Sequence, residues 1–214
     1  MAGRRAPARR PVTPGRPASG RAAPKIGVLA LQGDVIEHLK MLQRLGVEAI
    51  EVRTPEDLAQ VDALIIPGGE STTIGKLAVE YGLDRAIPAR VKDGMPVYGT
   101  CAGMIALSKE ASGGEPPLLR LMNIAVRRNA YGRQVDSFET DLEIPALGGP
   151  PLHAVFIRAP VIEKVGPEVE VLASLDGKPV LARQGNLLVS AFHPELTADD
   201  RVHRYFVEML KKKH

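Results

Sequence analysis

The sequence predicts an α/β fold, with an open and mostly parallel sheet that has helices on both faces. Uninterrupted apolar runs at residues 25–31 and 63–66 are typical of strands buried on both faces of a parallel sheet. An amphipathic helical pattern at residues 35–45 lies between them. This alternation is the βαβ rhythm of an open α/β sheet, in which ligands bind at the loops beyond the carboxyl ends of the strands.

The first half of the chain gives its elements in a regular order. After the strand at residues 25–31 and a turn at residues 32–33, Asp34 is predicted as the N-cap of a helix that Gly46 ends. The remaining elements of this half are predicted to be a strand at 47–53, a short helical turn at 55–60, a strand at 63–66, helices at about 71–81 and 83–92, and a strand at 97–98.

The second half is richer in strands. Asp176 and Gly177 form a hairpin signal between segments 170–174 and 179–183. Further extended segments are expected at 119–128, 134–142, 153–160 and 187–192, with turns at 112–117 and at 129–133, where Gly132 suits a positive φ. A closing amphipathic helix at about residues 199–211 presents Val202, Phe206 and Met209 on one face.

The composition limits the class of protein. A chain of 214 residues with 44% hydrophobic content is long enough for one substantial domain. A single cysteine rules out an internal disulfide framework, so we expect a reducing compartment, the cytoplasm. No apolar run approaches the roughly 18 residues that a membrane span needs, and we therefore expect no membrane partner.

Residues 1–24 are predicted to be a disordered basic tail, followed by one folded domain at residues 25–214. The tail is almost entirely Arg, Ala, Pro and Gly, a composition that buries too little apolar surface to fold. It is an anchor for an anionic surface, an Arg-rich targeting peptide, or an extension without a role; it lacks the apolar segment of a secretory signal. Subtracting its six arginines and Lys25 from the net charge of +3 leaves −4, so despite a pI near 9.1 we expect no nucleic-acid partner.

The only cysteine, Cys101, lies in the sequence Gly-Thr-Cys-Ala-Gly at residues 99–103, between a buried strand and a helix expected to begin near Met104. This pattern predicts a nucleophile elbow with sulfur in place of oxygen. The strained turn needs small flanking residues, and Gly99 and Gly103 provide them. A helix N-terminus favours thiolate over thiol. The alternative is a buried and inert cysteine.

A nucleophilic cysteine needs a general base, and imidazole is the usual choice near neutral pH. His193 follows the apolar segment 187–192, so it stands at a strand end, and Glu195 can come round Pro194 to orient its ring. The alternative is a strand-end histidine with no contact to Cys101. The other histidines are His38 and His203, expected at the surface of helices, His153, which begins a strand, and His214 at the end of the chain.

Two further signals are weaker. Residues 67–73, Pro-Gly-Gly-Glu-Ser-Thr-Thr, allow backbone N–H groups to approach a ligand, and Ser71 or Thr72 is expected to cap the following helix. Without other evidence, this segment would be interpreted as an ordinary strand-to-helix turn. It also lacks the Gly-Lys-Ser/Thr ending of a phosphate loop. Arginines that either grip a carboxylate or sit on a solvated face are Arg127, Arg128 and Arg133.

The elbow together with His-Pro-Glu at residues 193–195 resembles the triad (class I) glutamine amidotransferases, whose fold is flavodoxin-like. Several segments narrow the resemblance to the glutaminase subunit of pyridoxal 5′-phosphate synthase. They are Leu-Gln-Gly-Asp at 31–34, residues 67–73, Arg-Asn and Gly-Arg-Gln-x-x-Ser-Phe within 128–138, Phe-Ile-Arg-Ala-Pro at 156–160 and Phe-His-Pro-Glu-Leu-Thr at 192–197. The similarity runs from Lys25 to the C-terminus, so residues 25–214 would form the glutamine amidotransferase domain. Tyr131 stands where the family leads us to expect Phe.

The resemblance implies a mechanism. Cys101 would attack the side-chain amide carbon of L-glutamine, His193 would carry the proton to ammonia, and Glu195 would orient His193. The oxyanion would be met by backbone N–H groups of Gly69 and Ala102. The glutamine-binding positions would be Gly69, Glu70, Ser71, Arg128, Ile157 and Arg158.

The resemblance also implies a partner. Family members deliver ammonia to a TIM-barrel synthase subunit in a heteromeric complex, which condenses it with a pentose phosphate and a triose phosphate; Gln32 would lie near that interface. No cofactor and no metal are expected. The alternatives are the glutaminase subunit of another amidotransferase, a cysteine hydrolase on the same scaffold, and a catalytically silent interaction subunit.

Overall fold

The computed structural model describes residues 24–114, 116–128 and 137–211. The predicted tail at residues 1–24 therefore lies outside the described residues except for its last member. The same holds for the turn at 129–133 with Gly132, Tyr131 and Arg133, and for His214.

A seven-stranded sheet in the order β10-β11-β12-β4-β3-β1-β2 forms the centre of the molecule. Its strands are β1 (Lys25–Leu29), β2 (Glu48–Val52), β3 (Ala63–Ile66), β4 (Val97–Thr100), β10 (Glu170–Leu175), β11 (Lys178–Gln184) and β12 (Leu187–Ser190). The five strands from β12 to β2 pair in parallel, and β10 and β11 are antiparallel. The order 2-1-3-4 of the first four strands is that of flavodoxin-like sheets. The predicted open, mostly parallel sheet is confirmed.

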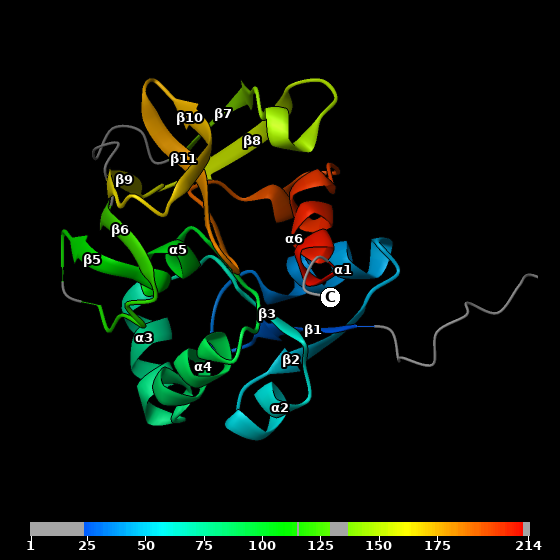
Figure 1. Cartoon of the computed structure of the whole chain (residues 1–214), viewed down its shortest axis with the longest axis vertical. Helices are drawn as coiled ribbons and strands as arrows, with labels where there is room; N and C mark the ends of the chain where they lie inside the picture. The colour runs from blue at the N-terminus through cyan, green and yellow to red at the C-terminus, as the bar shows by residue number, and fades with distance from the viewer. Residues whose placement is uncertain (1–23, 115, 129–136, 212–214) are drawn as a thin grey trace, which may run out of the picture.

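Helices cover both faces of this sheet. They are α1 (Val35–Arg44), α2 (Pro55–Ala59), α3 (Ser71–Glu80), α4 (Leu83–Lys92), α5 (Ala102–Leu107) and α6 (Arg201–Lys211). Figure 1 shows α1 and α6 on one side of the central strands and α3 and α4 on the other. The predicted face of α6 is confirmed, because Val202, Phe206 and Met209 are buried.

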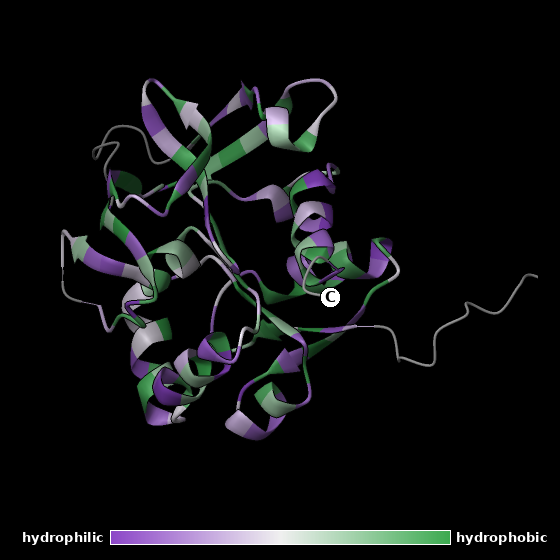
Figure 2. Cartoon of the chain, viewed as in Figure 1, coloured by the Kyte–Doolittle hydropathy of each residue, from purple (hydrophilic) through white to green (hydrophobic). Residues whose placement is uncertain are grey.

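The core lies where the helices meet the sheet. Every residue of β3, β4 and β12 is buried, and Figure 2 shows hydrophobic residues along these central strands and polar ones on the outer sides of the helices. Burial on both faces explains why these strands read as uninterrupted apolar runs. Across the described ranges, no helix is long and apolar enough to cross a membrane.

Two smaller sheets stand beside the carboxyl ends of the parallel strands. They contain β5 (Ser108–Ser112), β6 (Met122–Arg127) and β9 (Val161–Val165), and separately β7 (Ser137–Leu142) and β8 (Leu152–Ile157); short 3-10 turns are η1 (Pro145–Leu147) and η2 (Pro194–Leu196). The hairpin signal is confirmed, since Asp176 and Gly177 have φ of 50° and 74° between β10 and β11.

One expectation for this region is wrong. The helix after the elbow begins at Ala102 rather than near Met104, and it ends at Leu107. The strands β5 and β9 were not predicted. In β5 only Ser108 is buried, so no apolar run marks it, and the strand exists because it pairs with β6.

Candidate active site

Cys101 sits between β4 and α5 with φ 47° and ψ −101°, a conformation that non-glycine residues rarely adopt. Its backbone N–H donates to Ser190 O at 2.8 Å, which ties the turn to β12. The residue is 8% exposed, and its thiol lies 3.8 Å from Ile157 O. The predicted elbow geometry is confirmed.

The two glycines of the elbow are required by crowding. A Cβ atom on Gly99 would lie 2.5 Å from the carbonyl carbon of Gly103, and one on Gly103 would collide with Ile66 O of the neighbouring strand β3. Because real Cβ atoms do not approach backbone so closely, any larger residue would push α5 away from the sheet. The spacing Gly-x-Cys-x-Gly is therefore a consequence of the close packing between the strand and the helix of the elbow.

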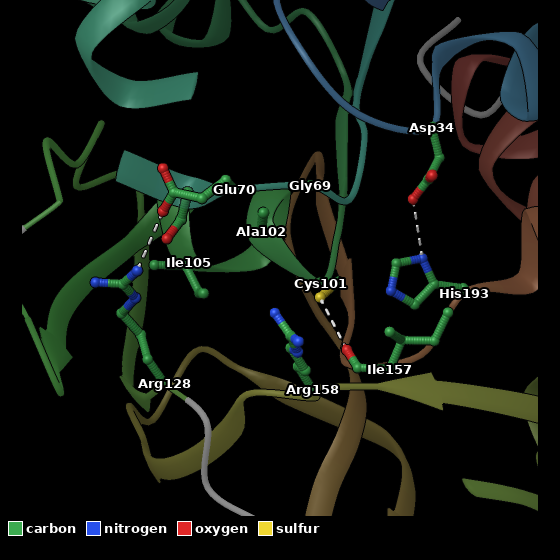
Figure 3. A pocket seen from close by; sticks show the side chains of 11 residues that line it. Asp34, Gly69, Glu70, Cys101, Ala102, Ile105, Arg128, Ile157, Arg158 and His193 are labelled. Atoms are coloured by element: carbon green, nitrogen blue, oxygen red, sulfur yellow. Dashed lines mark hydrogen bonds and ion pairs between the residues drawn. The ribbon is translucent and has the colours of Figure 1, made fainter. Parts of the chain in front are cut away.

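His193 and Glu195 form a buried pair at the end of β12. His193 Nδ1 lies 2.7 Å from Glu195 Oε1, and the two residues are 3% and 5% exposed. Since an ionised carboxylate only accepts, Nδ1 carries the proton of this bond. Nε2 is buried and has no hydrogen-bond partner within the described part of the chain, so it remains for proton exchange on the side of the ring that faces the thiol (Figure 3).

Asp34 is a second carboxylate at the same imidazole. It occupies the N-cap position of α1 as predicted, but its side chain makes no capping bond. Its Oδ2 lies instead 3.4 Å from His193 Nδ1 (Figure 3). Sequence reasoning missed this contact, although Asp34 follows the carboxyl end of the first strand, at the edge where such sheets bind ligands.

The surroundings favour a charged imidazole beside the thiol. Burial alone would lower the pKa of His193, but the influence of nearby Asp34, Cys101 and Glu195 outweighs burial and raises this pKa to about 12. Burial raises the pKa of Glu195, and the contact with His193 opposes that shift. The imidazole of His193 therefore holds its proton beside the Cys101 side chain.

A pocket of about 570 Å³ opens beside the thiol, with Cys101, Ala102 and His193 in its wall. The six residues expected to bind glutamine all line it, namely Gly69, Glu70, Ser71, Arg128, Ile157 and Arg158. Asp34 and Ile105 line it as well and were not predicted. The loops after β3 and β4, 32 residues apart in sequence, thus meet at one edge of the sheet, as expected (Figure 3).

Glu70 organises the loop after β3. Contrary to the sequence analysis, neither Ser71 nor Thr72 caps α3: the Glu70 carboxylate accepts from Thr72 N at 2.9 Å and from Thr73 N at 2.7 Å. Although burial opposes the charge, the hydrogen bonds from Thr73 and Thr72 lower the pKa of Glu70 to about 2. Glu70 is thus an anion at the pocket, with Arg128 Nη2 3.4 Å away.

Gln32 braces the same loop, since Glu70 N donates to Gln32 Oε1 at 2.6 Å. Gly69 has φ 150°, and a Cβ there would collide with Gln32 Oε1, so the pocket wall and the loop after β1 are in close contact. The role of Gln32 at a partner interface stays a prediction. Of the arginines, Arg127 pairs with Glu163 at 2.7 Å outside the pocket, whereas Arg128 lines it.

Two histidines lie elsewhere than expected. His38 and His203 were predicted at the helix surface, but both are fully buried and His38 Nδ1 lies 2.9 Å from His203 Nε2. The prediction failed because α1 and α6 turn these side chains toward each other in the core, where one nitrogen of each ring is paired with the other ring. His153 is exposed and pairs with Glu139 and Asp141 at 2.8 and 3.0 Å.

One group among the described residues brings three potential metal ligands together. Atoms of Asp34, His193 and Glu195 lie within 4.8 Å of one another. Two of the atoms that would coordinate an ion, His193 Nδ1 and Glu195 Oε1, are instead hydrogen-bonded to each other at 2.7 Å. The geometry is therefore that of a carboxylate-oriented imidazole.

Known proteins resemble this chain over most of its length. The model of the SNO glutamine amidotransferase family matches residues 28–212. The chain is 58% identical over 188 residues to the pyridoxal 5′-phosphate synthase subunit PdxT of Carboxydothermus hydrogenoformans, covering 88% of this chain and 98% of that protein. It is 62% identical to PdxT of Herpetosiphon aurantiacus, covering 85% and 98%.

Solved structures show the same similarity. A crystal structure of a glutamine amidotransferase is 56% identical, with a TM-score of 0.83 over 87% of this chain and 98% of that one. The structure of PurLQS from Thermotoga maritima, 16% identical with a TM-score of 0.62 over 88% of this chain and all of that one, shares the fold.

Proposed function

The chain belongs to the SNO glutamine amidotransferase family, and from this premise we propose that it hydrolyses L-glutamine to L-glutamate and ammonia for pyridoxal 5′-phosphate synthesis. The observation that carries the proposal is the 2.7 Å bond between His193 Nδ1 and Glu195 Oε1, which leaves Nε2 for the thiol of the elbow. Cys101, His193 and Glu195 are the proposed catalytic residues.

The first step is attack by sulfur. With His193 protonated, the Cys101 thiolate adds to the amide carbon of glutamine, forming a C–S bond and moving the carbonyl electrons onto oxygen. Backbone N–H groups of Gly69 and Ala102 are proposed to stabilise this oxyanion, and such a donor contributes about 3 to 4 kcal/mol to the transition state. Both residues line the pocket.

The second step releases ammonia. The His193 imidazolium gives its Nε2 proton to the amide nitrogen, the C–N bond breaks, and a γ-glutamyl thioester remains on Cys101. His193, now neutral, takes a proton from water, whose oxygen attacks the thioester. Glutamate leaves and the thiolate–imidazolium pair is restored. Glu195 keeps Nδ1–H fixed throughout, so the ring stays aligned.

Charge in the pocket suits the α-groups of glutamine. Arg128 and Arg158 are proposed to hold the α-carboxylate, because guanidinium groups bind carboxylates bidentately. The Glu70 anion suits the α-ammonium group. Gly69, Ser71 and Ile157 complete the proposed binding surface.

The ammonia is proposed to pass to a TIM-barrel synthase subunit in a heteromeric complex, with Gln32 near the interface and no cofactor on this chain. The relatives named above are themselves subunits of pyridoxal 5′-phosphate synthase, which supports a partner of that kind. Residues 25–214 are the proposed amidotransferase domain. The proposed location is the cytoplasm, without a nucleic-acid or membrane partner.

Reconstitution tests the function. The chain is mixed with a candidate synthase subunit, ribose 5-phosphate, glyceraldehyde 3-phosphate and glutamine, and the pyridoxal chromophore is followed. Wild type should give product from glutamine, and Cys101→Ala should give product only when an ammonium salt replaces glutamine. If active synthases make product from the ammonium salt but none from glutamine with the wild-type chain, the chain serves a different synthase.

A further inference from the structure

The buried histidine His38, on α1, lies directly behind the catalytic pair without lining the pocket. Its Nε2 is 3.2 Å from Thr100 Oγ1, the residue before the nucleophile, and 3.6 Å from Glu195 Oε1. Its Nδ1 is 2.9 Å from His203 Nε2 on α6. His38, Thr100, Glu195 and His203 are all 5% exposed or less. The contacts form a buried polar chain from α6 to the active site.

The contact with His193 supplies most of the compensation for the buried Glu195 carboxylate, on one of its two oxygens. Its Oε1 is bonded to His193, and its Oε2 is buried without a hydrogen-bond partner in the described ranges. Burial raises the pKa of this carboxyl. A buried carboxylate stays ionised only when nearby donors favour the charge. After His193, His38 brings a second ring nitrogen close to this carboxylate, with Nε2 3.6 Å from Oε1.

The proton positions follow from the geometry. If His38 Nδ1 donated to His203, the lone pair of His38 Nε2 would face the Glu195 carboxylate, and the His203 Nδ1 proton would be buried without an acceptor. If His203 Nε2 donates, His38 Nε2–H points toward Thr100 Oγ1 and Glu195 Oε1. The second arrangement replaces the repulsion between the Nε2 lone pair and the Glu195 carboxylate by an attraction between Nε2–H and that carboxylate. It requires both rings to be neutral, and burial, with the nearby His203 and His193, lowers the pKa of His38 well below its usual value.

We propose that His38 is a positioning residue of the active site, whose Nε2–H, oriented by His203, holds Glu195 ionised and aligned with His193. The inference rests on the proposed function, because it extends the same catalytic machinery by one element. It also links α1, which follows the Gln32 loop, to the triad. At 3.6 Å the contact with Glu195 is a charge–dipole interaction, and the hydroxyl of Thr100 shares the same proton.

Several other titratable groups surround His38. The titratable groups that face it are Glu195 and His193 beyond β12, His203 on α6, and Tyr98 on β4, whose ring stands edge-on at 6.4 Å. Tyr98 has its pKa raised well above the usual value by burial, so it is neutral. Burial lowers the pKa of His203, and the charge of Asp200 opposes that shift only in part. Glu37, Lys40 and Arg44 of α1 line a separate surface hollow beside Glu195.

The test compares His38→Gln, whose amide N–H reaches the Nε2 position, with His38→Leu, which has a similar size and no donor. The pH profile of kcat/KM for glutamine is measured with the synthase subunit present. His38→Leu should move the acidic limb upward by about one pH unit and lower kcat at pH 7 roughly tenfold. The reason is that an unsupported Glu195 protonates at higher pH. His38→Gln should keep the wild-type limb, and KM should stay within about twofold in both variants.

Controls separate this role from folding. His153→Leu removes an exposed histidine that also contacts carboxylates and should leave the profile unchanged. If His38→Leu does not fold, His38→Asn replaces it, because Asn keeps a group toward His203 and lacks one toward Glu195, and the same shift is expected. The inference is overturned if His38→Leu or His38→Asn keeps the wild-type pH profile, or if His38→Gln shows the same shift as they do. The proposed function would stand in either case. A wild type inactive on glutamine with an ammonia-competent synthase overturns the proposed function as well.

Discussion

The imidazole of His193 lies against the backbone of Gly68, in the loop after β3. A Cβ atom on Gly68 would overlap His193 Cε1 and would lie 3.0 Å from Asp34 Oδ2. The absence of a side chain at this position lets the ring sit close to the pocket wall that carries Gly69. Small backbone changes here therefore act directly on His193, the proposed general base.

Gly68→Ala should lower kcat at least tenfold, because the methyl group displaces the His193 ring from its position beside Cys101. Glutamate release in the presence of the synthase measures the effect. Gly82→Ala is the control: its Cβ would meet open space, so only the φ of 73° matters, and we expect a loss of about 1 kcal/mol in stability with normal kcat. Equal kcat in the two variants would contradict the crowding argument.

At the residue scale, the sequence predicted the proposed catalytic residues better than the side chains that surround them. Cys101, His193 and Glu195 were predictable because glycines and strand ends mark such positions in any parallel sheet. Asp34 was predicted as a helix cap and His38 as a surface residue, yet both turn toward the catalytic pair. Side-chain direction depends on how α1 packs on the sheet, and the pattern of one helix does not contain that information.

At the scale of elements, α3 depends on a carboxylate in front of its first turn. Glu70 accepts two backbone N–H bonds there and also faces Arg128. This N-terminal cap fixes the loop that lines the pocket. Stability and the proposed substrate binding therefore depend on one residue, Glu70.

Glu70→Ala should lower the free energy of unfolding by about 1 kcal/mol at pH 7, the usual cost of losing an N-cap. The folded pKa of about 2 lies below the ordinary 4.5, so this stabilisation is present above pH 4.5 and is lost as pH falls toward 2. Urea unfolding at pH 7, 5 and 4 should show a constant difference from wild type to about pH 5 and a smaller one below it.

Glu80→Ala is the matched control, because Glu80 is the last residue of α3, where a negative charge gains nothing from the helix dipole. We expect it to be neutral or slightly stabilising. A Glu80→Ala loss equal to that of Glu70→Ala would show that the cap has no special role.

The elements themselves were predictable where burial is continuous. The boundaries of α4 and β3 agree with the prediction, because apolar spacing and flanking glycines define them. β5 and β9 were missed: Ser108–Ser112 has neither an apolar run nor a regular alternation, and Val161–Val165 ends in exposed residues. Such strands form through pairing with a distant neighbour, which local sequence does not encode.

At the scale of the whole molecule, two buried neutral histidines join α1 and α6 across the core. Burial lowers the pKa of His203 to about 4 and that of His38 well below its usual value. The unfolded chain binds protons at these sites near pH 6.5, and the folded chain does not. Stability is therefore lost as pH falls from about 6.5 toward 4, by about 1.4 kcal/mol per pH unit for each proton taken up on unfolding.

The double variant His38→Leu, His203→Leu should flatten this acid dependence. Urea unfolding at pH 7, 6 and 5 measures the slope of the unfolding free energy. Between pH 6 and 5, His153→Leu should keep the wild-type slope, because its hydrogen bonds with Glu139 and Asp141 raise the pKa of His153, so that its contribution changes mainly above pH 6. An unchanged slope in the double variant would mean that the histidine pair is not neutral in the folded protein.

The overall architecture was predictable because alternation of buried strands and amphipathic helices allows few arrangements. The meeting of the loops after β3 and β4 at one sheet edge followed from that rule alone. The closeness of α6 to α1, and with it the His38–His203 contact, did not, since it depends on the packing of two helices distant in sequence.

The central claim is that Cys101 forms a thioester with the γ-carbonyl of glutamine. Isotope-labelled glutamine is added to the chain with its synthase subunit, the reaction is stopped with acid during turnover, and peptides are analysed by mass spectrometry. We expect label on the peptide that contains Cys101. The Cys101→Ala variant should give neither a labelled peptide nor glutamate. Glutamate formation by Cys101→Ala at the wild-type rate, or label carried by another residue, would contradict it.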